Sequence, residues 1–173
     1  MRYKTLGTTG EKLSALTLGT WGIGGTGWGE TSQSNSLAAI DRMLELGVNL
    51  VDTAPVYGFG NPGEQDFGFG CAERLLAKAL KGRRDKVFLV TKCGLNYDRS
   101  KGPSSAYRSM SAQEIREGCE NSLRRLGTDY LDLLLVHWPD GKTPLEEVAQ
   151  AMEDLIRRGL IKYYGVSNFS VED

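Results

Sequence analysis

Four side chains that can hold or transfer a proton are spaced along the chain near the ends of apolar segments. They are a carboxylate, a phenol, an ammonium and the chain's single histidine: Asp52, Tyr57, Lys92 and His137. Three of the four directly follow an apolar segment, at 48–51, 87–91 and 131–136. In a barrel of alternating strands and helices, the carboxyl ends of all strands face one mouth, where active sites form. We therefore expect these side chains to meet in one pocket.

The four residue types make chemical sense as a proton-donating set. A free tyrosine has a pKa of about 10, which is too high for an efficient acid or base at neutral pH. A nearby ammonium stabilises tyrosinate, so Lys92 is expected to lower the pKa of Tyr57. Asp52 would hold Lys92 charged and oriented, while His137 would hydrogen-bond a carbonyl oxygen or share the proton. Such a site protonates an oxygen as a hydride reaches the adjacent carbon.

Each of these residues also has an ordinary structural explanation. A single histidine at the end of a strand is more often structural than catalytic, and an Asp–Lys pair usually stabilises packing. Tyr57 closely follows Pro55 and could simply pack against that turn. The functional interpretation is favoured because three successive apolar segments carry such a group at the same end, which chance would rarely produce.

The apolar segments alternate with helical patterns. Five segments are expected to be strands, at 16–20, 48–51, 87–91, 131–136 and 162–166. Four helices are expected between them, at about 34–46, 71–81, 111–126 and 143–158. Because the strands are continuously apolar, we expect them to be parallel and covered on both faces. The alternating order predicts an α/β barrel that starts at about residue 15, with a small hairpin within residues 1–14 before it.

Two of the expected helices begin with capping signals. Ser111 with Glu114, and Thr143 with Glu146, match the capping box, in which side chains satisfy free backbone donors of the first turn. Pro144 would also occupy the first helical position. A glycine follows each helix and suits the left-handed turn that ends it: Gly47, Gly82, Gly127 and Gly159.

Two long loops, at 58–70 and 95–110, follow the second and third expected strands. The first has Gly-Phe-Gly at both ends, which indicates a local duplication. Loops of this length inside a compact domain are usually functional or mobile.

Composition limits the class of protein. With 173 residues, 21 Lys plus Arg, 22 Asp plus Glu and 40% hydrophobic residues, the chain is typical of a soluble globular protein with one core. A net charge of −1 gives no reason to expect nucleic acid or an anionic membrane as a partner. No apolar run reaches the roughly 18 residues of a membrane span, and no signal peptide is evident. Three widely spaced cysteines favour neither a disulfide framework nor a zinc site, so a reducing cytoplasm is expected.

Four motifs taken together resemble the aldo-keto reductase superfamily. They are Asp52-Thr53-Ala54-Pro55-Val56-Tyr57-Gly58, Val90-Thr91-Lys92, Leu135-Val136-His137-Trp138-Pro139 and Gly165-Val166-Ser167-Asn168-Phe169. Gly19-Thr20-Trp21, after the first strand, fits as well, and the similarity covers essentially the whole chain. The overall pattern is most similar to bacterial members that act on sugars or small aldehydes.

The resemblance implies a (β/α)8 barrel of the TIM type that reduces aldehyde or ketone carbonyls, or oxidises the alcohols, without a metal. NADPH is the implied cofactor, with NADH as the alternative, and the implied substrate is a small carbonyl compound or sugar. By the same likeness Tyr57 is the general acid. Asp52 and Lys92 would tune it, and His137 would orient the carbonyl. The implied cofactor contacts are Thr20, Trp21, Asp52, Ser167 and Asn168. One departure is that the loop 58–70 is longer than is usual after the tyrosine of this family.

Two alternative functions have to be considered. Residues 22–27 match G-x-G-x-x-G after a strand, and Asp52 ends the next strand, as in a Rossmann-type dinucleotide-binding module. Against it, residues 28–31 separate the last glycine from the helix, and the other three reactive side chains stay unexplained. The second alternative is a non-catalytic regulatory or scaffold subunit that binds nicotinamide, which the intact set of four residues disfavours.

The chain is shorter than a complete barrel of this type, which takes roughly 250 residues. The first five strands and four helices are expected within 1–173. Ser170, followed by Glu172 and Asp173, resembles the start of a further helix. We therefore expect residues 1–173 to be the N-terminal part of a single barrel that alone binds NADPH poorly and has little activity. An open sheet would also leave free edges on its first and last strands, which favours self-association.

Overall fold

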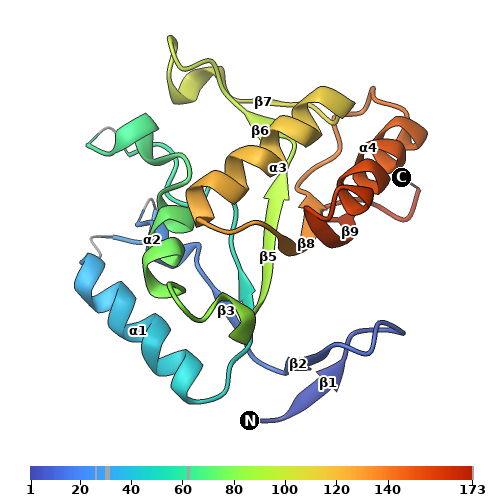
Figure 1. Cartoon of the computed structure of the whole chain (residues 1–173). Coiled ribbons are helices and arrows are strands. Elements are labelled where there is room, and N and C mark those ends of the chain that lie inside the picture. The colour runs from blue at the N-terminus through green and yellow to red at the C-terminus, as the bar shows by residue number, and fades with distance from the viewer. Residues whose placement is uncertain (26, 30–31, 62, 173) are drawn as a thin grey trace.

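The computed structural model describes residues 1–25, 27–29, 32–61 and 63–172, and its centre is a five-stranded parallel sheet (Figure 1). The strands are β3 (Thr17–Gly19), β4 (Leu50–Asp52), β5 (Phe88–Cys93), β8 (Leu131–Val136) and β9 (Ile161–Val166). They lie side by side in sequence order, and each neighbouring pair is parallel. The parallel sheet predicted from the continuously apolar segments is confirmed.

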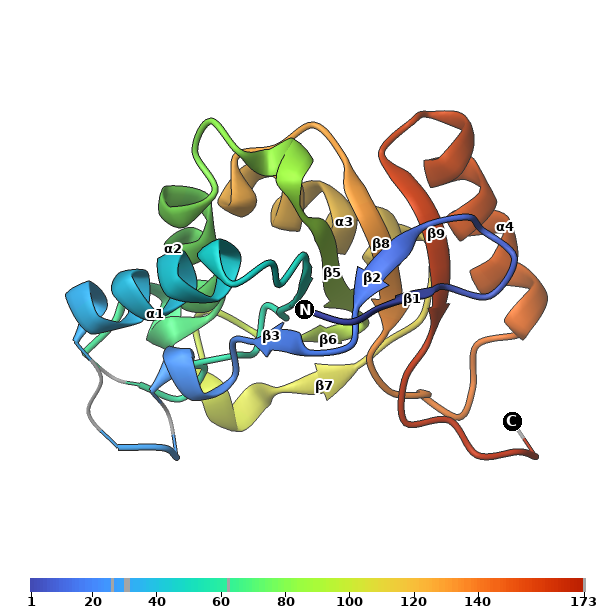
Figure 2. The same cartoon turned by 90° about the horizontal axis from the view of Figure 1, so that it is seen from below.

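Helices connect successive strands of the sheet. The α-helices in the described part of the chain are α1 (Gln33–Glu45), α2 (Cys71–Ala79), α3 (Ala112–Leu126) and α4 (Leu145–Arg157). Short 3₁₀ helices lie in the connections: η1 (Gly22–Gly24), η2 (Gln65–Gly68), η3 (Arg84–Lys86) and η4 (Pro103–Ser105). Viewed from below, the α-helices form an arc around the sheet (Figure 2). Of the helices described, none is long and apolar enough to cross a bilayer.

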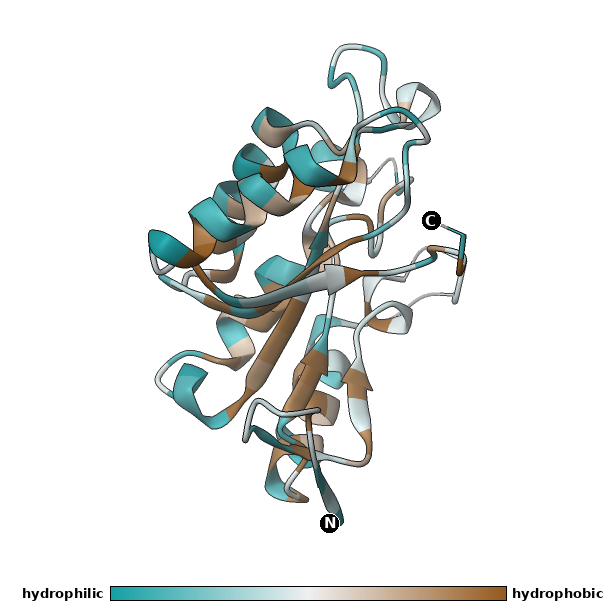
Figure 3. Ribbon diagram, turned by 90° about the vertical axis from the view of Figure 1, so that its right-hand side faces the viewer, coloured by the Kyte–Doolittle hydropathy of each residue, from teal (hydrophilic) through white to brown (hydrophobic). Residues whose placement is uncertain are grey.

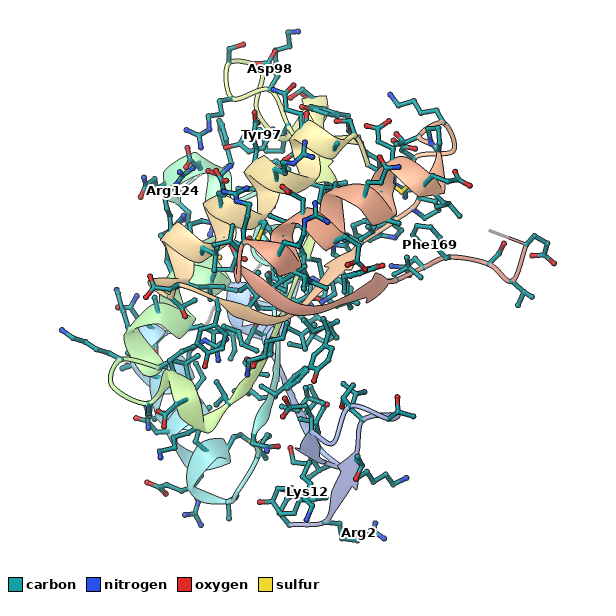
Figure 4. All side chains as sticks on the ribbon, turned by 45° about the vertical axis from the view of Figure 1, so that its right-hand side comes forward. Arg2, Lys12, Tyr97, Asp98, Arg124 and Phe169 are labelled. Carbon is teal, nitrogen blue, oxygen red and sulfur yellow. The ribbon has the colours of Figure 1, made fainter. Side chains whose placement is uncertain are left out.

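Two small antiparallel hairpins lie at opposite ends of the molecule. The pairs are β1 (Tyr3–Thr5) with β2 (Lys12–Ser14), and β6 (Leu95–Asn96) with β7 (Tyr107–Arg108). The hairpin β1–β2 lies where the parallel strands begin, whereas β6–β7 lies where β5 ends (Figure 1). Lys12 and Tyr97 mark these two ends in Figure 4. The segment expected to be a long loop at 95–110 is therefore partly a hairpin.

Side chains of the sheet alternate between two faces because the period of a strand is two residues. On the outer face, Leu89 and Leu134 are completely buried against the helices, and each such burial contributes about 1.5–3 kcal/mol. Hydrophobic residues concentrate in the strands and on the sides of the helices that face them (Figure 3). On the inner face, Phe88 and Val90 form a second, smaller cluster. Lys92 continues this alternation and therefore emerges on the inner face at the end of β5.

The start of α3 follows the sequence signal. Ser111 is the N-cap residue, and its hydroxyl accepts a hydrogen bond from the Glu114 backbone N–H at 3.3 Å. The Glu114 carboxylate accepts from Asn96 Nδ2 at 2.5 Å and from the Tyr107 hydroxyl at 2.9 Å. The Ser111 half of the predicted capping box is confirmed. The Glu114 half is not, because the Glu114 carboxylate binds the β6–β7 hairpin and the Ser111 backbone N–H donates to Ser109 Oγ at 3.4 Å.

The capping box predicted at Thr143 was wrong. α4 begins after Pro144, which is its N-cap residue and makes no side-chain cap, so Pro144 does not occupy the first helical position. Thr143 instead donates its hydroxyl to Asp140 Oδ2 at 2.6 Å, and its backbone N–H donates to Asp140 Oδ1 at 2.9 Å. Hydrogen bonds to a charged carboxylate are stronger than those between neutral groups. Asp140, in the turn before α4, therefore accepts the hydrogen bond of the Thr143 hydroxyl, which the sequence pattern had assigned to the N-cap.

Candidate active site

The parallel strands bring the candidate side chains to one end of the sheet. Asp52 ends β4, Lys92 lies near the end of β5, and His137 directly follows β8. Tyr57 lies in the connection after β4. The first three residues continue the inner-face alternation of their strands, so they converge on the inner side of the sheet rather than on the helices.

Asp52, Tyr57 and Lys92 form a closed set of contacts. Lys92 Nζ donates to Asp52 Oδ2 at 2.7 Å, to the Tyr57 hydroxyl at 3.0 Å and to the Thr53 carbonyl at 3.0 Å. The Tyr57 hydroxyl in turn donates to Asp52 Oδ1 at 3.2 Å. Lys92 is only 5% exposed, so these interactions are little screened by water. The convergence expected from the strand ends is present in the structure.

The predicted lowering of the pKa of Tyr57 was wrong. Burial raises the pKa of Tyr57 above its usual value, and the Asp52 carboxylate, which accepts its hydrogen bond, raises it further. Burial also lowers the pKa of Lys92, and the carboxylates of Asp52 and Glu73 oppose that effect. The spacing in the sequence could not show that the phenol contacts an anion as well as a cation. Tyr57 therefore holds its proton at neutral pH.

His137 lies beside this set as a neutral ring. It is 6% exposed, and its ring is edge-on to that of Tyr57, with centroids 6.2 Å apart. It also stacks on Trp138, with centroids 3.6 Å apart. Burial lowers the pKa of His137 to about 3, helped by the positive charges of Lys92 and Arg108. A neutral imidazole can donate a hydrogen bond to an oxygen without adding a charge to the site.

The residues expected to contact a cofactor differ in how much of their surface is exposed. Thr20 is completely buried, and both its hydroxyl and its backbone N–H donate to the Asp52 carbonyl at 3.0 Å. Thr20 therefore joins the ends of β3 and β4 and offers no surface to a ligand. Trp21 is 57% exposed, and its ring stacks on that of Tyr57 with centroids 6.2 Å apart.

Ser167 and Asn168 lie next to His137. The Asn168 side-chain amide donates to the His137 carbonyl at 2.8 Å and to Ser167 Oγ at 3.0 Å. The backbone of Asn168 is left-handed, with φ of 59°, a conformation that asparagine tolerates better than most residues. The structure thus places both residues at the end of β9, next to the backbone of His137.

Sequence reasoning missed a buried carboxylate behind the site. Glu73, on α2, is completely buried and accepts hydrogen bonds from Thr91 Oγ1 at 2.7 Å and from Arg125 Nε at 2.5 Å. A signal was available, because Glu73 shares a helix face with Leu76 and Leu80, both buried apolar residues. A charged residue inside an apolar stripe indicates a buried partner.

The loop 58–70 packs through aromatic rings against the segment that follows β6. Phe59 and Phe69, from the two Gly-Phe-Gly repeats, lie with ring centroids 4.6 Å and 5.2 Å from that of Tyr97. Gly58 cannot carry a side chain, because a Cβ there would lie 2.1 Å from Cys71 Sγ. The repeat therefore places two phenylalanines in one cluster around Tyr97. Pro62 of this loop lies outside the described residues.

A cavity of about 860 Å³ is not lined by any of the four candidate catalytic residues. It lies between η1, α1, α2 and the loop 58–70, and Arg74 and Lys78 are among its lining residues. Their cationic groups donate to neutral acceptors: Arg74 to the Phe69 carbonyl, and Lys78 to Gln33. The candidate site is instead the end of the sheet itself.

The structure argues against the Rossmann alternative. The sheet pairs its strands in plain sequence order, and α1 begins at Gln33 rather than at the last glycine of the motif. The first glycines of that motif form η1, while Thr26, Glu30 and Thr31 lie outside the described residues.

A family model for the Aldo/keto reductase family matches residues 15–173. The chain belongs to this family. The resemblance inferred from the strand-end motifs is thereby confirmed. The predicted α/β fold of the (β/α)8 type is confirmed as well, with a parallel sheet of five strands and four α-helices in the described residues.

Individual relatives are similar along nearly the whole chain. It is 43% identical over 174 residues to aldo-keto reductase YhdN of Bacillus subtilis (strain 168), covering 99% of this chain and 48% of the relative. It is 36% identical over 185 residues to an NADH-specific methylglyoxal reductase of Escherichia coli (strain K12), covering 99% and 53%. The glycerol dehydrogenase AKR11B4 from Gluconobacter oxydans superposes with a TM-score of 0.81 at 37% identity, covering 98% and 49%. The chain therefore spans about half the length of the relatives it matches.

Proposed function

We propose that the chain carries the proton-donating part of the active site of an NAD(P)H-dependent oxidoreductase, as the N-terminal part of a single barrel. The enzyme would reduce aldehyde or ketone groups of small molecules, or oxidise the corresponding alcohols. The observation that carries the proposal is the position of Lys92 Nζ, which is 2.7 Å from Asp52 Oδ2 and 3.0 Å from the Tyr57 hydroxyl. Such a buried ammonium is suited to stabilise the anion that forms when the phenol releases its proton.

The residues at this mouth fit a nicotinamide ring. Asn168 and Ser167 offer an amide and a hydroxyl that match the donor and acceptor of a carboxamide, and Trp21 offers an exposed ring for stacking. When bound, a reduced nicotinamide supplies a hydride to the carbonyl carbon. We propose NADPH as the cofactor, with NADH as the alternative because one relative is named as NADH-specific.

The chain's own residues would orient the carbonyl and protonate it. Neutral His137 donates a hydrogen bond to the carbonyl oxygen and holds it beside the Tyr57 hydroxyl. The O–H bond of Tyr57 breaks as negative charge develops on that oxygen, and the proton passes to it. Lys92 stabilises the resulting tyrosinate, and Asp52 keeps Lys92 in place. Oxidation of an alcohol follows the same steps in reverse.

We propose small polar carbonyl compounds, or their alcohols, as substrates because relatives are named as methylglyoxal reductases and a glycerol dehydrogenase. A cytoplasmic location is proposed as well, which suits the free thiols Cys71, Cys93 and Cys119. We propose neither nucleic acid nor membrane as a partner. The end strands of the sheet order, β3 and β9, are the proposed edges for any self-association.

Replacing Tyr57 with Phe in the complete barrel that contains residues 1–173 tests the proposal. The phenol's proton is lost while the ring stays, so turnover of methylglyoxal with NADPH or NADH should fall by about a hundredfold or more. Binding of the reduced cofactor, followed by its fluorescence, should be retained. Tyr163→Phe, on the same face of the sheet, is the matched control and should keep full turnover.

Two results would contradict the proposal. If the complete barrel that contains residues 1–173 turns over neither cofactor with any small aldehyde or alcohol, the proposed oxidoreductase function is wrong. Unchanged turnover in Tyr57→Phe would remove the phenol from the mechanism. A protein that binds the cofactor without turnover would instead support the regulatory or scaffold subunit.

A further inference from the structure

A carboxylate that the proposed mechanism does not use lies directly behind the strand that carries Lys92. Glu73 is completely buried on α2, on the helix face that also carries the buried Leu76, and it contacts α3 and β5. Its two oxygens accept from Thr91 Oγ1, at 2.7 Å, and from Arg125 Nε, at 2.5 Å. Buried ion pairs can often be replaced by apolar side chains without loss of stability. Packing alone therefore does not account for a charge at this position.

The contact to Thr91 connects Glu73 to the backbone next to Lys92. Thr91 and Lys92 are consecutive in β5, so their side chains point to opposite faces of the sheet. Glu73 therefore contacts β5 on its outer face, at the position where the Lys92 side chain extends from the inner face. Its charge also acts across the strand: burial lowers the pKa of Lys92, and the carboxylates of Asp52 and Glu73 raise it.

Arg125 connects the same carboxylate to the loop 58–70. Its guanidinium lies over the Phe69 ring, 5.6 Å from the centroid, and it donates to Ser122 Oγ at 3.1 Å. A Cβ on Gly70 would lie 2.3 Å from Arg125 Cδ, so the arginine packs closely along the end of that loop. The arginine is 16% exposed at its side chain, and Glu73 is its ion-pair partner. The pair therefore holds α2, α3, the loop and β5 together behind the site.

We propose that Glu73 is a positioning residue for the candidate site: its carboxylate, held by Arg125, fixes β5 through Thr91 and thereby holds Lys92 beside Asp52 and Tyr57. The catalytic meaning of this role rests on the proposed function. The effect on Lys92 itself does not, and it can be measured separately.

Charged and titratable groups approach Lys92 from each element packed around it. Asp52 comes from β4, Tyr57 from the connection after it, and His137 from the end of β8. Glu73 comes from α2 on the outer face, where Arg125 of α3 balances it. The charge of Arg108, on β7, acts on His137. Removing the charge of Glu73 leaves Asp52 as the carboxylate that contacts Lys92.

The test compares Glu73→Gln with Glu73→Asp and with a matched control, Asp132→Asn. Gln keeps the size and an acceptor but loses the charge, whereas Asp keeps the charge. Asp132 is also a buried carboxylate, 2% exposed, and it pairs with Arg84 and Lys162, each at 2.7 Å. It lies near the start of β8, away from the strand ends that carry the site. The control thus reports the cost of neutralising a buried ion pair in the same sheet.

The titration of Lys92 is followed by NMR on isotopically labelled lysine side chains, with Lys92→Arg to assign the signal. We expect Lys92 to titrate at a lower pH in Glu73→Gln than in the native protein, and at the native pH in Asp132→Asn. Glu73→Asp should move it back toward the native value. In the active enzyme, kcat of Glu73→Gln should fall by about tenfold with KM little changed, because the effect acts through Lys92.

An unchanged Lys92 titration in Glu73→Gln would overturn the proposal and leave Glu73 a purely structural residue. If that variant does not fold, Thr91→Val tests the same link, since it removes the hydroxyl but not the ion pair. Full kcat in Thr91→Val would contradict positioning through β5. A native protein without turnover, but with the Lys92 shift present, would refute the proposed function and leave the positioning role intact.

Discussion

The two ends of the sheet each hold a carboxylate paired with lysine, buried at Asp132 and partly exposed at Asp52, yet their other partners differ in kind. At the end where the strands begin, Asp132 binds Arg84 and Lys162, each at 2.7 Å, and the Leu89 backbone N–H at 2.8 Å. At the opposite end, Asp52 binds Lys92 and the Tyr57 hydroxyl. Two cations and a backbone donor fix the first carboxylate. The second shares its lysine with a group that can release a proton.

The two lysines are shifted in opposite directions. The hydrogen bond to Asp132 raises the pKa of Lys162, whose side chain is 46% exposed and stays hydrated. Burial lowers the pKa of Lys92, whose side chain is 6% exposed. An ion pair near water raises the pKa of its lysine. Burial lowers the pKa, which brings the lysine closer to losing its proton. This difference shows that an Asp–Lys pair alone does not indicate chemistry; its burial and its third partner do.

The largest expected contrast is between Lys92→Met and Lys162→Met. Methionine fills a similar volume without the charge, so Lys92→Met should lower kcat by about a hundredfold to ten thousandfold because the tyrosinate loses its stabilising cation. Stability should fall as well, because the Asp52 carboxylate loses its cationic partner. Lys162→Met should keep full turnover and lower the free energy of unfolding by about 1 kcal/mol or less. Steady-state kinetics and urea unfolding measure both, and equal kinetic effects would remove the contrast.

A second contrast concerns how stability depends on pH, because the chain's single histidine, His137, lies at the candidate site and not at the opposite end of the sheet. Burial and neighbouring cations lower its pKa from 6.5 to about 3, so the unfolded chain binds a proton that the folded chain rejects. The stability that comes from keeping His137 neutral is fully present above pH 6.5 and is lost progressively as the pH falls toward 3. In His137→Gln, the slope of unfolding free energy against pH in this window should therefore be shallower. Urea unfolding at several pH values measures the slope, and identical slopes would contradict the buried neutral ring.

The smallest contrast uses two stacked aromatic pairs of nearly the same geometry. Trp21 lies over Tyr57 with centroids 6.2 Å apart, and Phe88 lies over Tyr163 with centroids 6.2 Å apart. Trp21→Ala should raise KM for the cofactor about threefold to tenfold, the value of one aromatic contact, with little loss of stability because Trp21 is exposed. Tyr163→Ala should lower stability and leave KM unchanged. The prediction fails if the two variants exchange these effects.

Much of the fold follows from local signals. Apolar runs predicted the five strands to within two residues at each end, because parallel strands that are covered by helices carry mostly apolar side chains. Ser111 capped α3 as expected, since its partner lies only three residues away. Thr143 did not, because Asp140 lies in the same turn and offers a charged acceptor. A local pattern fails where a second local partner competes for the same group.

The sequence by itself determined which reactive side chains lie at the strand ends, because strand polarity places successive carboxyl ends together. Tertiary structure alone decided how those groups behave. The raised pKa of Tyr57 depends on burial and on Asp52 at 3.2 Å. The burial of Thr20 and the contact of Glu73 with Thr91 depend on elements that are distant in the chain. Position along a strand is a property of neighbours in sequence, whereas solvation and charge are properties of neighbours in space.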